Sequence, residues 1–381
     1  MNSINIWEFG GRISIKINNG FLKNIKEKLF NKYKTKKSMF NNIKNTKNIT
    51  FYTFNNILKE SYNKRFFIPI KVWVDLCEAI GISLEELQQN IEAYKTSNGP
   101  NYVYEPILPV RITPIFDMII AHNIADGTVI NPKKGRLPYF GYRQIDPFIR
   151  ELYIKKLESI FGKINFPNKY YLNSTRPYCP PVLSSLFFLI YNLNTKSFLS
   201  RSARIPNEIL NKNIEHLLSV LIAFIIDEGN IDSTAIVIRL KNPKLTEDLF
   251  NICNKLCYKS TFTYNKDYGN LYILRDGMKK FFGDYKLMLK KYPEINLGKT
   301  ELKIENSLKI YNRVIYKSKG NRNIILNMLK YEDLTVNQIA LRIKMTRQGV
   351  RFHIHNIEKE NLILKKGFIG KKNIIYTYRG R

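Results

Sequence analysis

The feature that most restricts how this chain can fold is an apolar segment that occurs twice and ends each time in an acid and a glycine. The two copies read IIAHNIADG, which ends at Gly127, and LIAFIIDEG, which ends at Gly229. When the two glycines are aligned, Asp126 falls on Glu228, 102 positions further along the chain. A repeated unit of this length predicts two similar half-domains related by a pseudo-twofold axis.

The residues that follow each copy support the repeat. A segment with strand character comes first, at Leu137–Ile145 after one copy and at Thr234–Leu240 after the other. A helical pattern then opens at a proline in both cases, Pro147 and Pro243. The residues therefore predict two half-domains that each begin with a helix, two strands and a second helix.

The acid at the end of each copy is an unusual choice for its position. The second copy is apolar on all sides from Leu217 to Ile226, which predicts a helix that is buried all round. A carboxylate at the C-terminal end of such a helix is costly to bury and opposes the helix dipole. Two such acids at a pseudo-twofold axis would form a site for a divalent cation such as Mg²⁺, which suggests phosphodiester chemistry. The alternative is that each acid and glycine are only a helix C-cap followed by a turn.

The charge of the chain indicates the kind of partner. The 381 residues include 62 Lys and Arg against 31 Asp and Glu, a formal net charge of +31. An excess of this size argues against a neutral metabolic enzyme and favours a polyanionic partner, above all nucleic acid. The alternative is a genome bias that inflates Lys, although such a bias does not explain the shortage of acids. Hydrophobic residues make up 44% of the chain, enough for a sizeable core.

The composition also indicates the compartment. Four cysteines are too few for a disulfide scaffold, and we expect buried thiols in a reducing compartment. The N-terminal residues have no apolar stretch typical of a signal peptide, and no apolar run is long enough to cross a membrane. We therefore expect a cytoplasmic protein, nucleoid-associated if prokaryotic, with no membrane partner. The cysteines are Cys77, Cys179, Cys253 and Cys257.

Composition and pattern divide the chain into three predicted parts, 1–105, 106–316 and 317–381. The first part is basic and is predicted to be helical, with one helix opening at Pro69 and ending at Gly81, and a capping box of Ser83 and Glu86 opening the next. Short helices with tight turns are compatible with a helix-turn-helix unit, and a generic small helical domain is the alternative. In the middle part, the two halves are expected at about 106–200 and 201–316.

The two repeated segments resemble the paired motifs of LAGLIDADG homing endonucleases, and the similarity to single-chain members covers roughly 112–285. The resemblance implies an α+β fold of two pseudo-symmetric αββαββα half-domains that acts as a monomer, with its sheets along the DNA major groove. It also implies that the eighth motif position, here Asp126 and Glu228, is the catalytic acid that binds the metal. The small and glycine positions where the motif helices pack are Ala121, Ala223, Gly127 and Gly229.

The sequence departs from the family pattern at several motif positions. His122 and Asn123 are polar where the family prefers apolar residues, and Ile124 and Ile226 replace the usual first Asp. The family also uses a basic residue on the sheet near the metals, although no fixed motif marks it. Candidates for this basic pocket, which are equally well explained as charges that face DNA, are Arg143, Arg239 and Lys241.

The C-terminal part, 317–381, carries a second and independent signal. Thr335 with Gln338 forms a capping box before one helical pattern, and Thr346 precedes another whose apolar residues share one face. A basic hairpin follows, so the segment resembles a winged helix-turn-helix. A winged helix that docks on protein is the alternative. The residues expected to contact DNA, from the third helix and the wing, are Arg347, Gln348, Arg351, Phe352, Lys371 and Lys372.

Taken together, the sequence predicts a site-specific protein that binds double-stranded DNA. Its most concrete form is a Mg²⁺-dependent double-strand DNA endonuclease of the LAGLIDADG homing type. The alternative from another class is a DNA-binding transcriptional regulator whose LAGLIDADG module has lost catalysis. An RNA-binding role is a third possibility.

Overall fold

The structure of the protein is a computed structural model that describes most of the chain. It divides into two units, Met1–Glu301 and Leu302–Arg381. None of the described helices is both long enough and apolar enough to cross a membrane. The described residues are 3–9, 13–43, 49–96, 101–130, 137–166, 170–232, 234–311, 320–369 and 373–380.

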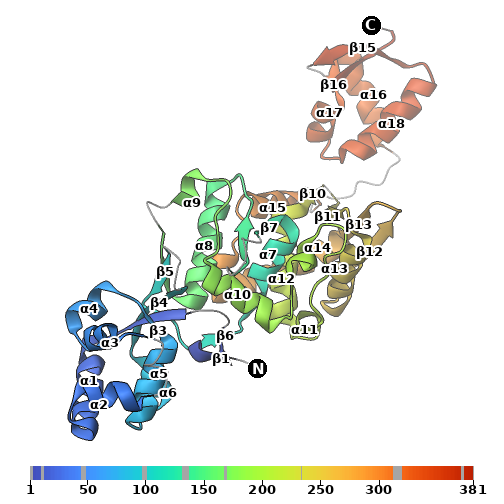
Figure 1. Cartoon of the computed structure of the whole chain (residues 1–381). Helices are drawn as coiled ribbons and strands as arrows, with labels where there is room; N and C mark the ends of the chain where they lie inside the picture. Colours follow the sequence, from blue (N-terminus) through green and yellow to red (C-terminus); the bar gives the residue numbers. More distant parts are fainter. Residues whose placement is uncertain are drawn as a thin grey trace. The chain divides into compact units, whose positions relative to one another are not determined.

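Two apolar helices, α7 (Pro114–Asp126) and α12 (Ile214–Glu228), pack against each other in the first unit (Figure 1). Both begin at a polar cap: the Thr113 side chain accepts a hydrogen bond from the first turn of α7, and the Asn213 side chain does so in α12. Almost every side chain of both helices is buried. The two helices predicted from the repeat are therefore confirmed, each ending in its acid.

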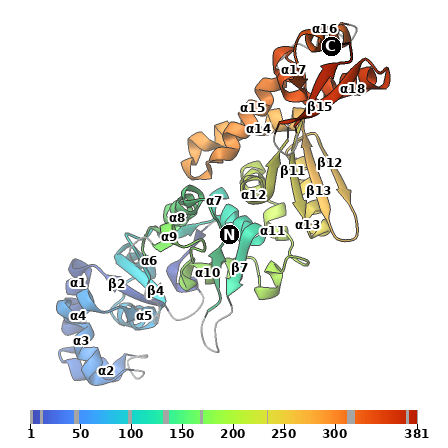
Figure 2. The ribbon, with the colours of Figure 1, turned by 90° about the horizontal axis from the view of Figure 1, so that it is seen from above.

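The second half has the full order αββαββα that was predicted for it. Its strands form an antiparallel sheet in the order β10-β11-β13-β12, and α13 and α14 pack against this sheet (Figure 2). Along β11, Ile236 and Ile238 are buried while Arg239 is exposed, the alternation expected of a sheet with one covered face. The elements are β10 (Gly229–Ile231), β11 (Ala235–Leu240), α13 (Pro243–Lys255), β12 (Ser260–Tyr264), β13 (Gly269–Leu274) and α14 (Arg275–Lys291).

The first half begins in the same way and then diverges. Strands β7 and β8 pair, and Gly141 of β8 forms an isolated bridge with Tyr178. The next strand, β9, pairs instead with β5 in a different sheet. A second complete αββαββα half is therefore wrong for the described residues of 106–200. The elements are β7 (Gly127–Ile130), β8 (Tyr139–Tyr142), α8 (Pro147–Phe161), β9 (Lys163–Asn165), α9 (Tyr170–Asn173) and α10 (Pro181–Ile190).

A single glycine explains the diversion of β9. Gly162, directly after α8, has a φ of 101°, a conformation that other residues rarely adopt. A Cβ atom added there would lie 2.5 Å from the carbonyl oxygen of Glu105. The chain therefore turns tightly against the residues that follow β5, and β9 continues the sheet to which β5 belongs.

That sheet makes the N-terminal region a mixed α/β structure, so the prediction of a purely helical domain for 1–105 is wrong. Its order is β3-β2-β4-β5-β9, and the boundary predicted at 105 falls between two of its paired strands. The alternating apolar residues Ile13, Ile15 and Ile17 form β2, a period-2 pattern within a segment otherwise rich in helices. The elements are β2 (Ile13–Ile17), α1 (Asn19–Tyr33), α2 (Lys36–Asn42), α3 (Phe51–Ile57), α4 (Glu60–Arg65), β3 (Ile68–Pro69), α5 (Ile70–Ala79), α6 (Leu84–Gln89), β4 (Ile91–Thr96) and β5 (Tyr102–Tyr104).

Short elements complete the first unit. Helices α5 and α6 begin where Pro69 and Ser83 predict, and the turn between them contains Gly81 at a φ of 71°. The division into 1–105, 106–316 and 317–381 stays a prediction. The remaining elements up to the second unit are β1 (Ser3–Ile4), β6 (Val110–Arg111), α11 (Asn207–Leu210) and α15 (Lys299–Tyr311).

The second unit contains three helices and a sheet of order β14-β16-β15 around one apolar core. The predicted capping box of Thr335 and Gln338 is present, and Thr346 caps the third helix by accepting from Gly349 N at 3.0 Å. The core includes Ile325, Leu329, Ile339, Val350, Ile354 and Ile357. The elements are α16 (Asn321–Tyr331), β14 (Leu334–Thr335), α17 (Val336–Arg342), α18 (Arg347–Lys359), β15 (Ile363–Ile369) and β16 (Asn373–Tyr378).

Candidate functional site

The glycines that end the two motif helices are required by a close approach of the backbone. Gly127 and Gly229 have φ values of −92° and −77°, so neither is the left-handed C-cap that often ends a helix. A Cβ atom at Gly127 would lie 2.3 Å from the carbonyl oxygen of Asn123, and one at Gly229 would lie 2.4 Å from that of Ile225. Each strand therefore leaves its helix pressed against the last turn, in the same way in both halves.

The acids immediately before these glycines are electrostatically coupled. Burial raises the pKa of Asp126 to about 6, and the neighbouring charge of Asp227 adds to the rise while Arg143 and Arg176 oppose it. Burial raises the pKa of Glu228 to about 7, and the charges of Asp126 and Asp227 add to that rise. The structure therefore brings the two acids predicted from the sequence into one half-buried, negatively charged site.

The donor set of this site suits a divalent cation. Carboxylate oxygens are the preferred ligands of Mg²⁺, which is typically held by one or two carboxylates together with water and phosphate oxygens. The mutual repulsion of Asp126 and Glu228 would be relieved by a bound cation, which would lower the pKa of both acids. Within the described residues, no group of three or more His, Cys, Asp or Glu side chains is arranged to hold a metal ion.

A third acid, Asp227, is held by the first half of the molecule. One oxygen of this fully buried carboxylate lies 2.7 Å from Nδ1 of His122, and the other accepts a hydrogen bond from the Tyr142 hydroxyl at 2.5 Å. The ring of Tyr142 stacks on that of Tyr153, with centroids 4.5 Å apart. The hydroxyl of Tyr153 accepts a hydrogen bond from Nδ2 of Asn123 at 3.0 Å. A polar network therefore ties α12 to α7, β8 and α8 beside the acid pair.

Two cationic or basic groups near this network are buried with an unsatisfied nitrogen. Among the described residues, neither Nε2 of His122 nor Nζ of Lys156 has a hydrogen-bond partner. Burial lowers the pKa of Lys156 to about 8, against the opposing charges of Asp227 and Glu294. Burial also lowers the pKa of His122, although Asp227 opposes the change. The interior of the first half is thus unusually polar for a core.

The opposite ends of the two helices carry another cluster that the sequence did not reveal. Asp117, fully buried in α7, lies 2.6 Å from Nδ1 of His216 and 2.8 Å from Nζ of Lys212. It also accepts a hydrogen bond from the hydroxyl of Tyr191. This cluster ties the N-terminal end of α7 to residues at and just before the start of α12, and all the donors to Asp117 come from other segments.

The predicted basic residues divide between the two halves. Arg143 is exposed beside the acid pair, where its backbone N–H donates to the carbonyl oxygen of Asp126 at 3.0 Å. Arg239 lies over the ring of Tyr268, 4.5 Å from its centroid, and Lys241 is exposed at the end of β11. Arg176, which the sequence did not single out, acts on Asp126 together with Arg143.

The predicted packing positions are buried in the helix pair. Ala121 and Ala223 have exposed fractions of 1% and 0%, as small residues between two closely packed helices would. The roles assigned to Ala121, Ala223, Gly127 and Gly229 in packing, and to Asp126 and Glu228 in catalysis and metal binding, stay predictions.

The predicted DNA-contacting residues of the second unit lie on one helix. Arg347, Gln348, Arg351 and Phe352 are all exposed on α18, and 64% of Phe352 is open to solvent. A large aromatic ring in that position, beside two arginines, suits contact with a partner. Lys371 and Lys372, predicted for the wing, lie outside the described residues.

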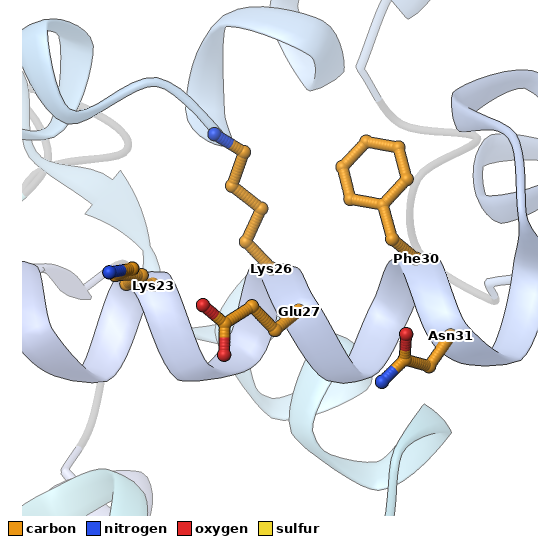
Figure 3. Close-up of a pocket in the computed structure, with 5 residues that line it drawn as sticks. All are labelled: Lys23, Lys26, Glu27, Phe30 and Asn31. Carbon is orange, nitrogen blue, oxygen red and sulfur yellow. The ribbon is translucent and has the colours of Figure 1, made fainter.

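A surface hollow of about 480 Å³ lies along α1, far in sequence from the acids. Figure 3 shows Lys26 and Phe30 projecting to the same side of this helix. No lining residue belongs to α7 or α12, and the lining mixes both charges, so the hollow offers no catalytic group set. It is lined by Lys23, Lys26, Glu27, Phe30 and Asn31.

The cysteines are all free thiols. Cys77, Cys179 and Cys253 are buried as predicted, whereas Cys257 is exposed. Burial raises the pKa of each of the three buried thiols to about 12, which leaves them unreactive near neutral pH.

The chain was compared with known proteins. It matches no family profile, and no curated protein matches it. Among solved structures it is similar to mesophilic variants of the homing endonuclease I-DmoI, at 16% identity over 45% of this chain and 88% of that one, with a TM-score of 0.33. It is also similar to the homing endonuclease I-WcaI bound to its DNA recognition sequence, at 14% identity over 45% and 80% of the two chains, with the same TM-score.

A further neighbour is I-DmoI in complex with DNA and Mn, at 14% identity over 44% of this chain and 93% of that one, with a TM-score of 0.31. At such identities and TM-scores these likenesses establish neither the fold family nor the function of this chain. The function is therefore inferred from the helix pair and its acids.

Proposed function

We propose that the protein is a site-specific, metal-dependent DNA endonuclease of the LAGLIDADG type. The observation that carries the proposal is the pair of coupled acids, Asp126 and Glu228, at the adjoining ends of two packed helices. The structure spends free energy to hold like charges together, which favours a cation site. The net charge of +31 favours a polyanionic substrate.

Each residue of the site has a proposed task. Asp126 and Glu228 would hold Mg²⁺, and Arg143 and Arg176 would attract a phosphate towards the same place. Bound Mg²⁺ supplies an activated water and stabilises the leaving oxygen of the phosphodiester. Asp227, fixed by His122 and Tyr142, would keep the end of α12 in position.

We further propose that the second unit is a winged helix-turn-helix that presents α18 to the DNA major groove. Support comes from three helices followed by a hairpin, and from the exposed Arg347 and Arg351 on one face. Double-stranded DNA is then the partner of both units, and the first unit would act as a monomer because it carries both motif helices in one chain.

The runner-up is a DNA-binding regulator that does not cut. The first half favours it, because its described strands form a sheet of only β7 and β8, extended by the bridge to Tyr178. A sheet this short would contact less DNA than the four strands of the second half. RNA binding remains a third and weaker alternative.

One experiment separates the nuclease from the regulator. Purified protein is incubated with random-sequence DNA and Mg²⁺, and both the cut ends and the bound fragments are sequenced. A nuclease yields a shared sequence at the cut ends, whereas a regulator yields enriched bound fragments without cuts.

Variants then test the acids. Asp126→Asn or Glu228→Gln should lower the cleavage rate at least about 10³-fold, because several kcal/mol of transition-state stabilisation are lost. DNA affinity should stay within a few-fold. Asp276→Asn, at an exposed acid paired with Lys259, is the matched control and should cleave normally. Cleavage that persists in the double variant of Asp126 and Glu228 would refute the assignment.

A further inference from the structure

The five-stranded sheet of the N-terminal region has two chemically different faces. In antiparallel pairs, residues directly opposite each other lie on the same face. Ile15 pairs with Tyr94, Tyr94 with Val103 and Val103 with Ile164, so these four share one face. All four are buried, which makes this the face turned to the core.

The other face carries aromatic and basic side chains. The register places Lys16 opposite Ala93 and Lys95 opposite Ser14, while Tyr104 lies opposite both Ala93 and Lys163. None of these basic or aromatic side chains is buried, and Tyr104 and Lys163 are exposed. We call this set the aromatic–basic face; its members are Lys16, Phe67, Lys95, Tyr102, Tyr104, Lys163 and Asn165.

The rings and cations of this face touch one another. Nζ of Lys16 lies 4.9 Å and Nζ of Lys95 lies 5.1 Å from the ring centroid of Phe67. The ring of Tyr102 lies 5.4 Å from that of Phe67 and 6.2 Å from that of Tyr104. These ring pairs are tilted and not stacked, so the tyrosine rings do not cover each other's faces.

One acid lies at the edge of this face. Nζ of Lys163 lies 2.6 Å from a carboxylate oxygen of Glu105 and 6.0 Å from the ring centroid of Tyr104. Both partners of the ion pair are more than half exposed, so the pair is weak and a phosphate could replace the carboxylate. The face therefore keeps a positive balance of three lysines against one glutamate.

This combination suits a single nucleic-acid strand. Exposed rings can stack on bases only where the bases are unpaired, because a duplex hides all base faces except those at its ends. Lysines beside the rings would neutralise the phosphates that connect the bases. A duplex would use the cations and leave the rings idle.

We propose that the aromatic–basic face binds single-stranded DNA, with successive bases on Tyr102 and Tyr104 and phosphates at Lys16, Lys95 and Lys163. The binding surface goes beyond the proposed cleavage of duplex DNA, and only the choice of DNA over RNA rests on that proposed function. The lysines over Phe67 would be held in place by its ring, which leaves the two tyrosines to receive bases.

The test measures fluorescence anisotropy of the full chain in EDTA, which suppresses cutting. The probes are oligothymidylate and oligouridylate of about 15 nucleotides, and a duplex of the same length. Tyr102→Ala/Tyr104→Ala should weaken oligothymidylate binding at least about tenfold, because two stacking partners are lost. Tyr102→Phe/Tyr104→Phe keeps both rings and should stay within about twofold of the wild type.

A second variant and a control guard against a folding defect. Lys16→Gln/Lys95→Gln leaves every ring in place and should reduce the log–log salt slope for oligothymidylate by about 1.4, from about 0.7 per phosphate. Tyr52→Ala removes an equally aromatic side chain that is 75% exposed on α3, and it should bind as the wild type does.

The outcomes are distinct from those of the cleavage assay. No binding of oligothymidylate by the wild type, or the same affinity after Tyr102→Ala/Tyr104→Ala, overturns the proposal while leaving cleavage untouched. Tighter binding of oligouridylate overturns the choice of DNA. Duplex cleavage that is lost with intact oligothymidylate binding would instead refute the proposed nuclease and leave this surface standing.

Discussion

The two halves of the first unit keep the same helices and differ in almost everything built around them. In each, a buried helix ends in an acid, and a glycine lets the next strand leave tightly against the last turn. In the second half the following strands close one sheet of four. In the first half, β9 joins a sheet of the N-terminal region.

The interiors differ as well. With the two glycines aligned, His122 takes the place of Phe224 and Asn123 that of Ile225, and all four are fully buried. The polar residues of the first half find partners in other segments, above all Asp227 of the second motif helix. The halves are therefore not independent copies, because the core of the first half includes a side chain from the second.

This difference teaches which part of the repeat is under the tightest physical constraint. The helix pair and the glycines leave little freedom, since the backbone would collide with any Cβ atom at those positions. A sheet edge is less constrained, because its unpaired N–H and C=O groups accept any strand that offers the complementary groups. Four predictions test this comparison, from the largest expected effect to the smallest.

The polar core of the first half should be essential where it meets the second. His122→Phe copies the second motif and leaves the buried carboxylate of Asp227 with the Tyr142 hydroxyl alone. We expect a loss of about 3 kcal/mol in the free energy of unfolding, measured by urea denaturation at neutral pH.

Its control also copies the other half. Asp227→Ala matches Ala125, and the double variant His122→Phe/Asp227→Ala removes both polar partners. Most of the lost stability should return, with about 1 kcal/mol still missing because the Tyr142 hydroxyl loses its acceptor. A double variant as unstable as the sum of both single ones would show that the contact is not a paired one.

The glycine junctions should be equivalent in the two halves. Gly127→Ala and Gly229→Ala should each cost about 2–4 kcal/mol of unfolding free energy, because the new methyl group would collide with the backbone of the last helical turn. Gly283→Ala is the matched control, since it lies exposed in α14 with nothing within 4 Å of the added atom. It should stabilise the protein by about 1 kcal/mol. Unequal losses at the two junctions would break the equivalence.

The acid pair should make stability fall as the pH rises. The folded state holds the protons of Asp126 and Glu228 more tightly than the unfolded state does, so stability is lost as the pH rises from 3.8 through about 6 for Asp126 and from 4.5 through about 7 for Glu228. A shift of this size is worth about 3 kcal/mol for a fully buried group, and solvent screening at these half-buried acids reduces it to about 1–2 kcal/mol.

Neutral substitutions should remove this loss. In EDTA at pH 8, Asp126→Asn and Glu228→Gln should each raise the free energy of unfolding by about 1–2 kcal/mol, and the gain should vanish near pH 4. Added Mg²⁺ should stabilise the wild type and not the variants. A variant whose gain is the same at both pH values would mean that the acids do not repel each other.

The arginines should have the smallest and most local effects. Arg239→Ala on the larger sheet and Arg143→Ala on the smaller one should each reduce the log–log salt slope of duplex binding by about 0.9 if each contacts one phosphate. Only Arg143→Ala should also move the pH dependence of cleavage upward, because Arg143 lowers the pKa of Asp126. Equal effects on cleavage would show that Arg143 has no special place beside the acids.

The sequence by itself determined the helix pair and its acids. A run that is apolar on every side can only be a buried helix, and an acid and glycine at matching positions fix where both copies end. The capped helices of the second unit and the helices that open at Pro147 and Pro243 follow from equally local signals. Each of these depends on residues that are neighbours in the chain.

Only the tertiary structure decided which strands pair and which polar groups meet. The three residues of β9 fit either sheet, and the tight turn at Gly162 against Glu105 directs them to the N-terminal one. Arg176 and Asp117 meet their partners across loops, and no spacing in the sequence announces such contacts. Local patterns fix a residue's conformation and burial, whereas its partners depend on how distant segments fold together.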